Sequence, residues 1–190
     1  MKLKKSLGQH FLKNPILSEK ISSLLQSTNE DIILEIGCGA GALTYYLINE
    51  KFKEFHIVEI DDQWATNAQK NFLTKENIFL HHKSILEVDV PSLCKNASLK
   101  IIGNIPYNIT FEIVNFIIKN HQYVETAIIM MQEEVALKLH KKSGRDYGPI
   151  SVLTQLYFEV TLHMQVGPQH FTPPPKVTSR VIELRRKECT

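Results

Sequence analysis

A buried strand that runs directly into a glycine-rich loop is the feature that most constrains the fold of this chain. Residues 31–36 are rich in Ile and Leu, with little alternation between apolar and polar positions. Such a run is typical of a strand in a parallel sheet, which is covered on both faces. Gly37-Cys38-Gly39-Ala40-Gly41 follows, and then a helical pattern from Ala42 to about Glu50. The order of strand, glycine loop and helix predicts the first unit of a doubly wound α/β fold.

Strands and helices continue to alternate beyond this unit. Asn14 and Pro15 are a typical N-cap and first-turn pair, so they predict a helix ahead of the first strand. Short apolar runs predict the later strands, and helical periodicity predicts the later helices. The expected strands are 55–60, 78–82, 100–103 and 126–131, and the expected helices are 62–72, a segment from a Thr110 cap through Phe111 to Ile118, and 133–140.

The pattern changes toward the end of the chain. After a polar loop at 141–148, apolar residues alternate with polar ones over 160–166 and over part of 177–184. This alternation predicts a half-exposed hairpin, joined by a stiff loop at 171–175 that contains three prolines. We therefore expect one α/β domain over residues 1–190. It should contain a doubly wound, Rossmann-like, mostly parallel seven-stranded sheet with an antiparallel final strand.

Composition narrows the class of protein. Hydrophobic residues make up 43% of the chain and charged residues 22%, as in an ordinary globular domain. The three cysteines show no CxxC spacing, so neither a disulfide framework nor a metal site is indicated. No stretch has the pattern of a signal peptide or a membrane span, so we expect a cytoplasmic protein without membrane contact. The net charge of +2 is small, but basic residues gather at both termini and at 141–145, which permits a phosphate-binding surface.

The glycine loop predicts a nucleotide-like ligand. Its Gly-x-Gly-x-Gly spacing departs from the dinucleotide fingerprint, because Ala42 stands where that fingerprint has its last glycine. Glu59 lies 22 positions after Gly37, at the end of the second strand, where a carboxylate can bind both hydroxyls of a ribose. This pair suits NAD and S-adenosylmethionine equally. A tight turn that only closes a strand is the alternative.

Asn104-Ile105-Pro106-Tyr107 follows the predicted strand at 100–103 and distinguishes between these ligands. The Asn104 amide oxygen and the carbonyl of Ile105 or Pro106 can accept hydrogen bonds from an amino group, and the Tyr107 ring can stack on a base. These groups suit methyl transfer to the amine of adenine, and a hydride-transfer enzyme has no use for them. Read alone, the segment is equally a proline turn beside a core tyrosine.

The chain resembles the small-subunit ribosomal RNA adenine dimethyltransferases of the KsgA type, which are S-adenosylmethionine-dependent methyltransferases of class I. The matching motifs occur in family order, from residue 5 to residue 184. They are 5–12 (KSLGQHFL), 34–41 (LEIGCGAG), 104–109 (NIPYNI), 132–136 (QEEVA), 146–148 (DYG), 151–155 (SVLTQ) and 171–179 (FTPPPKVTS).

This resemblance implies a role for each candidate residue. The cofactor S-adenosylmethionine would contact His10, Leu12, Gly37, Gly39, Glu59, Ser84 and Asn104. The catalytic residues would be Asn104, between cofactor and target amine, and Tyr107 and Phe171, on either side of a flipped adenine. Outside the motif context, His10 reads as a surface histidine and Phe171 as a core anchor. The basic and amphipathic pattern of residues 1–13 itself predicts either a flap over the site or a disordered tail. The implied partner is small-subunit ribosomal RNA or a small-subunit precursor, bound by a monomer.

Two features depart from the family pattern. Ser84 stands where the family usually has an acid that contacts the adenine amine of the cofactor, so cofactor affinity is in question. Family members usually continue into a small helical domain, which is absent before the chain ends at Thr190. Two other functions stay open. One is an Erm-type enzyme that methylates large-subunit RNA, and the other is a non-catalytic RNA-binding assembly factor.

Overall fold

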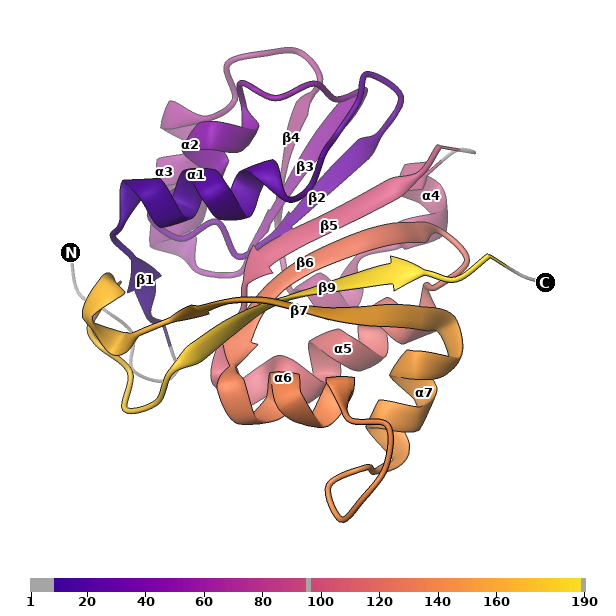
Figure 1. Ribbon diagram of the computed structural model, residues 1–190. Helices are drawn as coiled ribbons and strands as arrows, with labels where there is room; N and C mark the ends of the chain where they lie inside the picture. The colour runs from indigo at the N-terminus through magenta and orange to yellow at the C-terminus, as the bar shows by residue number, and fades with distance from the viewer. Residues whose placement is uncertain (1–8, 95–96, 189–190) are drawn as a thin grey trace.

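The computed structural model describes residues 9–94 and 97–188 (Figure 1). Within them, a seven-stranded sheet has the strand order β4-β3-β2-β5-β6-β9-β7. Its strands are β2 (Ile32–Ile36), β3 (Glu54–Glu59), β4 (Ile78–His82), β5 (Leu99–Asn104), β6 (Val124–Gln132), β7 (Phe158–Val166) and β9 (Ser179–Arg186). The five strands from β2 to β6 are parallel, and β9 runs antiparallel between β6 and β7. The predicted mostly parallel sheet with an antiparallel final strand is confirmed.

Helices cover both faces of this sheet (Figure 1). They are α1 (Pro15–Ser23), α2 (Thr44–Leu47), α3 (Asp62–Asn71), α4 (Val90–Cys94), α5 (Thr110–Lys119), α6 (Glu133–His140) and α7 (Pro149–Tyr157). Successive residues of a strand point to opposite faces, so the core divides into two clusters. Ile33 packs with residues of α1, α2 and α3, whereas Ile32 and Leu34 pack with residues of α4, α5 and α6.

Local sequence signals account for most of these helices. The Asn14 side chain accepts a hydrogen bond from the Leu17 N–H at 3.1 Å, and Pro15 opens α1, as expected. The α3 and α6 bounds agree with the predicted ranges to within one residue. The helix α2 is shorter than expected, because only residues 44–47 of the range 42–50 are α-helical.

Two local expectations need correction. Thr110 is not the cap of α5, because a short 3-10 helix over Tyr107–Ile109 leads directly into that helix. The Thr110 hydroxyl instead donates to the carbonyls of Pro106 and Tyr107, at 3.3 and 3.2 Å. The helix α7 was not predicted, although Pro149 after Gly148 is a typical helix start.

A second, two-stranded sheet holds the start of the described chain. The strand β1 (Phe11–Leu12) pairs antiparallel with β8 (Phe171–Thr172). The Lys13 N–H donates to the His170 carbonyl at 2.9 Å, and the Asn14 amide lies 3.1 Å from His170 Nδ1. Residues 9–13 of the predicted flap are therefore ordered against the loop before β9, and residues 1–8 lie outside the described part of the chain.

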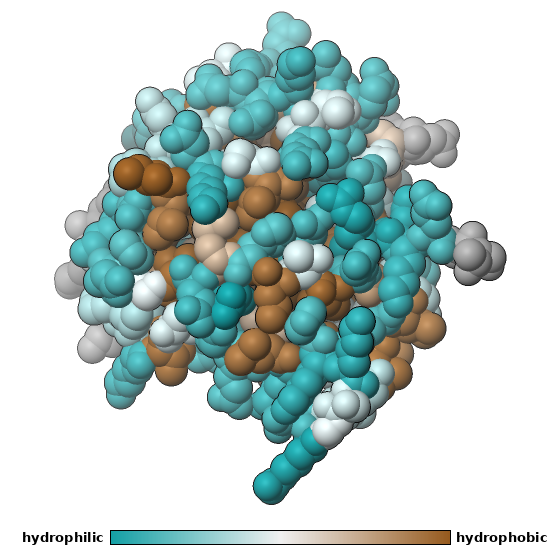
Figure 2. Space-filling model, viewed as in Figure 1, coloured by the Kyte–Doolittle hydropathy of each residue, from teal (hydrophilic) through white to brown (hydrophobic). Residues whose placement is uncertain are grey.

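The surface is mostly hydrophilic in the view of Figure 2, with apolar residues in separate patches. Among the exposed apolar side chains are Val152, Leu153 and Leu156 of α7. None of the helices in the described ranges is long and apolar enough to cross a membrane.

Candidate active site

A cavity of about 240 Å³ opens at the carboxyl ends of β2, β3 and β5. This is the edge where open parallel sheets bind their ligands. The cavity is lined by eight of the nine candidate residues, which are His10, Leu12, Gly37, Gly39, Glu59, Ser84, Asn104 and Tyr107. The structure therefore brings residues from five separate parts of the chain to one site, and it leaves out Phe171.

The glycine loop adopts a backbone that favours glycine. Gly37 and Gly39 have φ angles of +68° and +48°, in the left-handed region. A Cβ atom on Gly39 would also lie 2.5 Å from the Phe11 ring, so the loop packs closely beneath β1. The Glu59 carboxylate braces this loop, because it accepts hydrogen bonds from the N–H groups of Gly39 and Asp61, both at 2.9 Å.

Glu35 is a cavity residue that the sequence analysis did not assign. It lies at the end of β2, is 1% exposed, and accepts a hydrogen bond from the Thr44 hydroxyl at 2.8 Å. Burial, aided by the nearby Glu59 carboxylate, raises the pKa of Glu35 from 4.5 to about 8. The site therefore holds two carboxyl groups in different environments. Glu35 is protonated at neutral pH, and Glu59 accepts hydrogen bonds from backbone N–H groups. The signal in the sequence was an acid two residues before the glycine loop, inside an otherwise apolar strand.

Asn104 sits at the end of β5 with its amide in a defined orientation. Its Nδ2 donates to the His10 carbonyl at 2.8 Å. A carbonyl can only accept, so the Oδ1 atom must be on the other side of the amide. That oxygen has no hydrogen-bond partner among the described residues, and it can accept a hydrogen bond from a ligand in the cavity. The backbone of His10, directly before β1, thus fixes which end of the Asn104 amide faces the cavity.

The His10 side chain also contacts the predicted base-binding residue. Its ring stacks against the Tyr107 ring, with centroids 5.4 Å apart and planes 28° apart. Its Nδ1 lies 2.8 Å from the Pro173 carbonyl, so that nitrogen carries the hydrogen. His10 is therefore held between the Asn104–Tyr107 segment and the loop after β8.

Phe171 is the candidate that the structure places elsewhere. It is 1% exposed and packs in the hydrophobic cluster with Leu12 and Val181. The pairing of β8 with β1 sets this position, because Phe171 is the register partner of Leu12. In this conformation Phe171 is a core anchor and does not face Tyr107 across the cavity.

Ser84 shares the cavity wall with Gly37 and Glu59, as its place after β4 predicted. Its hydroxyl oxygen accepts a hydrogen bond from the Leu86 N–H at 3.3 Å and caps a short 3-10 helix, Ile85–Glu87. The Ser84 hydroxyl hydrogen and one lone pair remain for a ligand.

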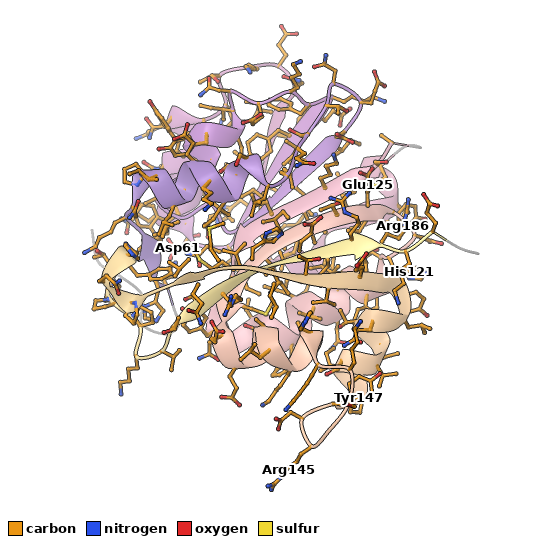
Figure 3. All side chains as sticks on the ribbon, in the orientation of Figure 1. Asp61, His121, Glu125, Arg145, Tyr147 and Arg186 are labelled. Atoms are coloured by element: carbon orange, nitrogen blue, oxygen red, sulfur yellow. The ribbon has the colours of Figure 1, made fainter. Side chains whose placement is uncertain are left out.

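The C-terminal basic cluster lies far from this cavity. The strand β9 begins beside the carboxyl end of β6, where Ser179 pairs with Gln132. It ends at Arg186, at the edge of the sheet where the parallel strands begin. Figure 3 shows this separation, with Arg186 and Arg145 far from Asp61 beside the cavity. Arg185 also pairs with Glu183 at 2.6 Å. The basic residues at the end of β9 and at 141–145 therefore do not surround the site, and the N-terminal lysines lie outside the described residues.

The doubly wound sheet and the cavity at its carboxyl edge define the class of Rossmann-like methyltransferases. Among solved structures, the 23S rRNA methyltransferase ErmE has a TM-score of 0.82 and 28% identity, over 93% of this chain and 70% of that one. A dimethyladenosine transferase from Plasmodium falciparum has a TM-score of 0.81 and 28% identity, over 94% of this chain and 64% of that one.

The chain belongs to the ribosomal RNA adenine dimethylase family, whose model matches residues 1–190. A ribosomal RNA small subunit methyltransferase A from Coxiella burnetii is 35% identical over 185 residues, which cover 97% of this chain and 71% of that protein. A protein of the same name from Prochlorococcus marinus is 38% identical over 186 residues, which cover 94% of this chain and 67% of that protein. The family expected from the motifs is confirmed.

Proposed function

We propose that this protein is an S-adenosylmethionine-dependent dimethyltransferase that adds two methyl groups in succession to the exocyclic amine of adenines in small-subunit ribosomal RNA. The family and its small-subunit relatives support the reaction and the RNA. The observation that carries the proposal is the Asn104 amide, whose orientation leaves Oδ1 free to bind the target amine. The protein would act during ribosome biogenesis, in the cytoplasm, as a monomer.

The cavity residues fit the proposed cofactor. Bound S-adenosylmethionine would supply a methyl group on a positively charged sulfur. Gly37 and Gly39 carry no side chains, so a ligand can approach the loop backbone closely, and Glu59 Oε1 keeps a lone pair for a ribose hydroxyl. The Glu59 carboxylate makes the cavity favourable for a ligand that carries positive charge. Ser84 would bind the adenine part through its hydroxyl.

Asn104 and a backbone carbonyl would orient the target amine. The Pro106 carbonyl already accepts hydrogen bonds from the Ile109 N–H and the Thr110 hydroxyl, both at 3.3 Å. Ile105 therefore supplies the second carbonyl acceptor. Two acceptors hold the amine hydrogens, direct the nitrogen lone pair and stabilise the positive charge that develops on nitrogen. Tyr107 would stack on the target base.

Substitution of Asn104 tests this assignment. Asn104→Ala should lower turnover by a factor of about 10² to 10³, the effect of removing one preorganised polar group. The measurement is transfer of labelled methyl groups from S-adenosylmethionine to unmethylated small subunits. Asn49→Ala, at an exposed position with a hydrogen bond to the Tyr45 carbonyl, is the matched control and should keep full activity. Near wild-type turnover by the Asn104 variant would exclude the assigned role.

Large-subunit RNA is the competing substrate. The 23S rRNA methyltransferase ErmE and the dimethyladenosine transferase match the fold of this chain equally well, with TM-scores of 0.82 and 0.81. The same labelled assay on separate small and large subunits decides between them. Label in large-subunit RNA alone would make the protein an Erm-type enzyme. Cofactor binding without transfer to either subunit would indicate a non-catalytic assembly factor.

A further inference from the structure

A buried serine holds the hydroxyl end of the Tyr107 side chain. Tyr107 Oη lies 2.6 Å from Ser179 Oγ. Tyr107 belongs to the short helix after β5, and Ser179 is the first residue of β9. The contact joins residues 72 positions apart, so it depends on the fold rather than on local sequence. The tyrosine ring is therefore fixed at both ends, by its backbone and by its hydroxyl.

Ser179 is a rigid support. It is fully buried, and its register partners are Gln132 on β6 and Val166 on β7. The next residue, Arg180, makes a two-pronged ion pair with Glu133, with Nη2 to Oε1 at 2.6 Å and Nε to Oε2 at 3.1 Å. Pairing on both sides and a clamped neighbour leave the serine little freedom to move.

In the hydrogen bond between Tyr107 and Ser179, the serine hydroxyl is the favoured donor. Among the described residues, Tyr107 Oη is the one hydrogen-bond partner of Ser179 Oγ. A buried hydroxyl hydrogen without an acceptor is costly, so the serine hydrogen points to the tyrosine oxygen. Tyr107 is partly exposed and can direct its own hydrogen toward the cavity or solvent. Burial raises the pKa of the Tyr107 phenol, so it stays protonated at neutral pH.

We propose that Ser179 is a positioning residue for methyl transfer, which acts by fixing the position of the Tyr107 ring on which the target adenine stacks. This role rests on the proposed function. Stacking depends on the relative orientation of the two rings. A ring that is fixed before the base arrives loses less freedom on binding. Ser179, the last residue of the 171–179 motif, would then support the ring of Tyr107.

Two variants break the same hydrogen bond from its two ends. Ser179→Ala and Tyr107→Phe should each lower kcat/KM for unmethylated small subunits by a factor of about five, which corresponds to one neutral hydrogen bond. The double variant should lose no more than either single one, because both remove one interaction. Cofactor affinity, measured by calorimetry, should not change. Ser22→Ala is the matched control, because Ser22 is buried on α1 and has no hydrogen-bond partner in the described part of the chain.

A spectroscopic readout separates positioning from general loss of stability. RNA with 2-aminopurine at the target adenine should show strong quenching when its base stacks on Tyr107 in the wild-type complex. Both variants should show weaker quenching. If Ser179→Ala does not fold, Tyr107→Phe alone decides, because it leaves β9 intact.

Unchanged kcat/KM and quenching in the variants, or losses that multiply in the double variant, would overturn the role of Ser179. A wild-type protein that methylates no RNA would overturn the proposed function itself, and this role with it.

Discussion

Glu35 is the residue whose chemistry depends most on its burial. Its pKa is about 8 in the folded protein, against 4.5 for a free carboxyl group. The unfolded chain therefore loses this proton near pH 4.5, and the folded protein keeps it to about pH 8. The contribution of Glu35 to the free energy of unfolding should be greatest below pH 4.5. It should fall as the pH rises from 4.5 to about 8.

The substitution Glu35→Gln tests this pH dependence. Glutamine keeps the shape of a protonated carboxyl group and cannot ionise, so the variant should be more stable than wild type near pH 8, by a few kcal/mol at most. The two proteins should converge toward pH 5. Thermal unfolding from pH 5 to 8.5, without cofactor, measures the difference. Glu50→Gln, at an exposed position, is the control. Parallel curves for wild type and Glu35→Gln would contradict the prediction.

Ser84 stands where the resemblance leads us to expect an acid, and its place in the cavity wall makes that expectation testable. Ser84→Asp should tighten S-adenosylmethionine binding by about 1 kcal/mol, or about fivefold, because a carboxylate accepts a stronger hydrogen bond from the adenine amine. Aspartate is also a good N-cap, so the helix Ile85–Glu87 should persist. Calorimetric titration gives the answer, with Ser84→Ala as a control that should not tighten binding. Equal or weaker binding by Ser84→Asp would show that Ser84 does not replace the acid.

At the scale of elements, β1 holds the start of the described chain beside the Asn104–Tyr107 segment. Backbone pairing holds Phe11 and Leu12 to β8. The N–H group of the next residue, Lys13, donates a hydrogen bond to the His170 carbonyl at 2.9 Å. The His10 carbonyl in turn orients the Asn104 amide. A looser β1 should therefore reduce turnover through Asn104.

Lys13→Pro removes one of these backbone donors and leaves the rest of the strand in place. Residue 12 is extended, which is the conformation that a following proline favours. Turnover should fall by a factor of about five relative to Lys13→Ala, which keeps the N–H group and controls for the lost charge. The measurement is single-turnover methyl transfer at saturating RNA and cofactor. Equal rates for the two variants would show that this hydrogen bond does not support the site.

At the scale of the whole molecule, the direction of the strands decides which cations can reach RNA near the cavity. Lys83 lines the cavity, and Lys176 lies in the exposed loop before β9 begins. Arg186 and Lys187 lie at the opposite edge of the sheet, where they hydrogen-bond to the carbonyls of Gln122 and Gln155.

Salt dependence of RNA binding tests this division. Each phosphate contact contributes about 0.7 to 0.9 to the slope of log affinity against log salt. The double substitution of Lys83 and Lys176 by Ser should flatten that slope by about 1 to 2. The same change at Arg186 and Lys187 should leave the slope unaltered, and it serves as the charge-matched control. A slope that responds only to the second pair would place the RNA at the far edge of the sheet.

Local sequence alone determined much of this protein. The apolar run at 31–36 and its glycines specified β2 and the ligand loop, because burial on both faces and positive φ angles leave few alternatives. Asn14 and Pro15 specified the start of α1 through a cap within three residues. The position of the Asn104 motif directly after a strand predicted its place at the carboxyl edge of the sheet, where the cavity lies.

Tertiary structure decided what these residues do to one another. The orientation of Asn104 comes from a carbonyl 94 positions away, and the Tyr107 ring is held by a serine 72 positions away. Phe171 faces the core because β8 pairs with β1, which no local pattern specifies. The pKa of Glu35 follows from burial by residues of several elements. Hydrogen-bond partners, burial and electrostatic neighbours are properties of the packed chain, and only the fold brings them together.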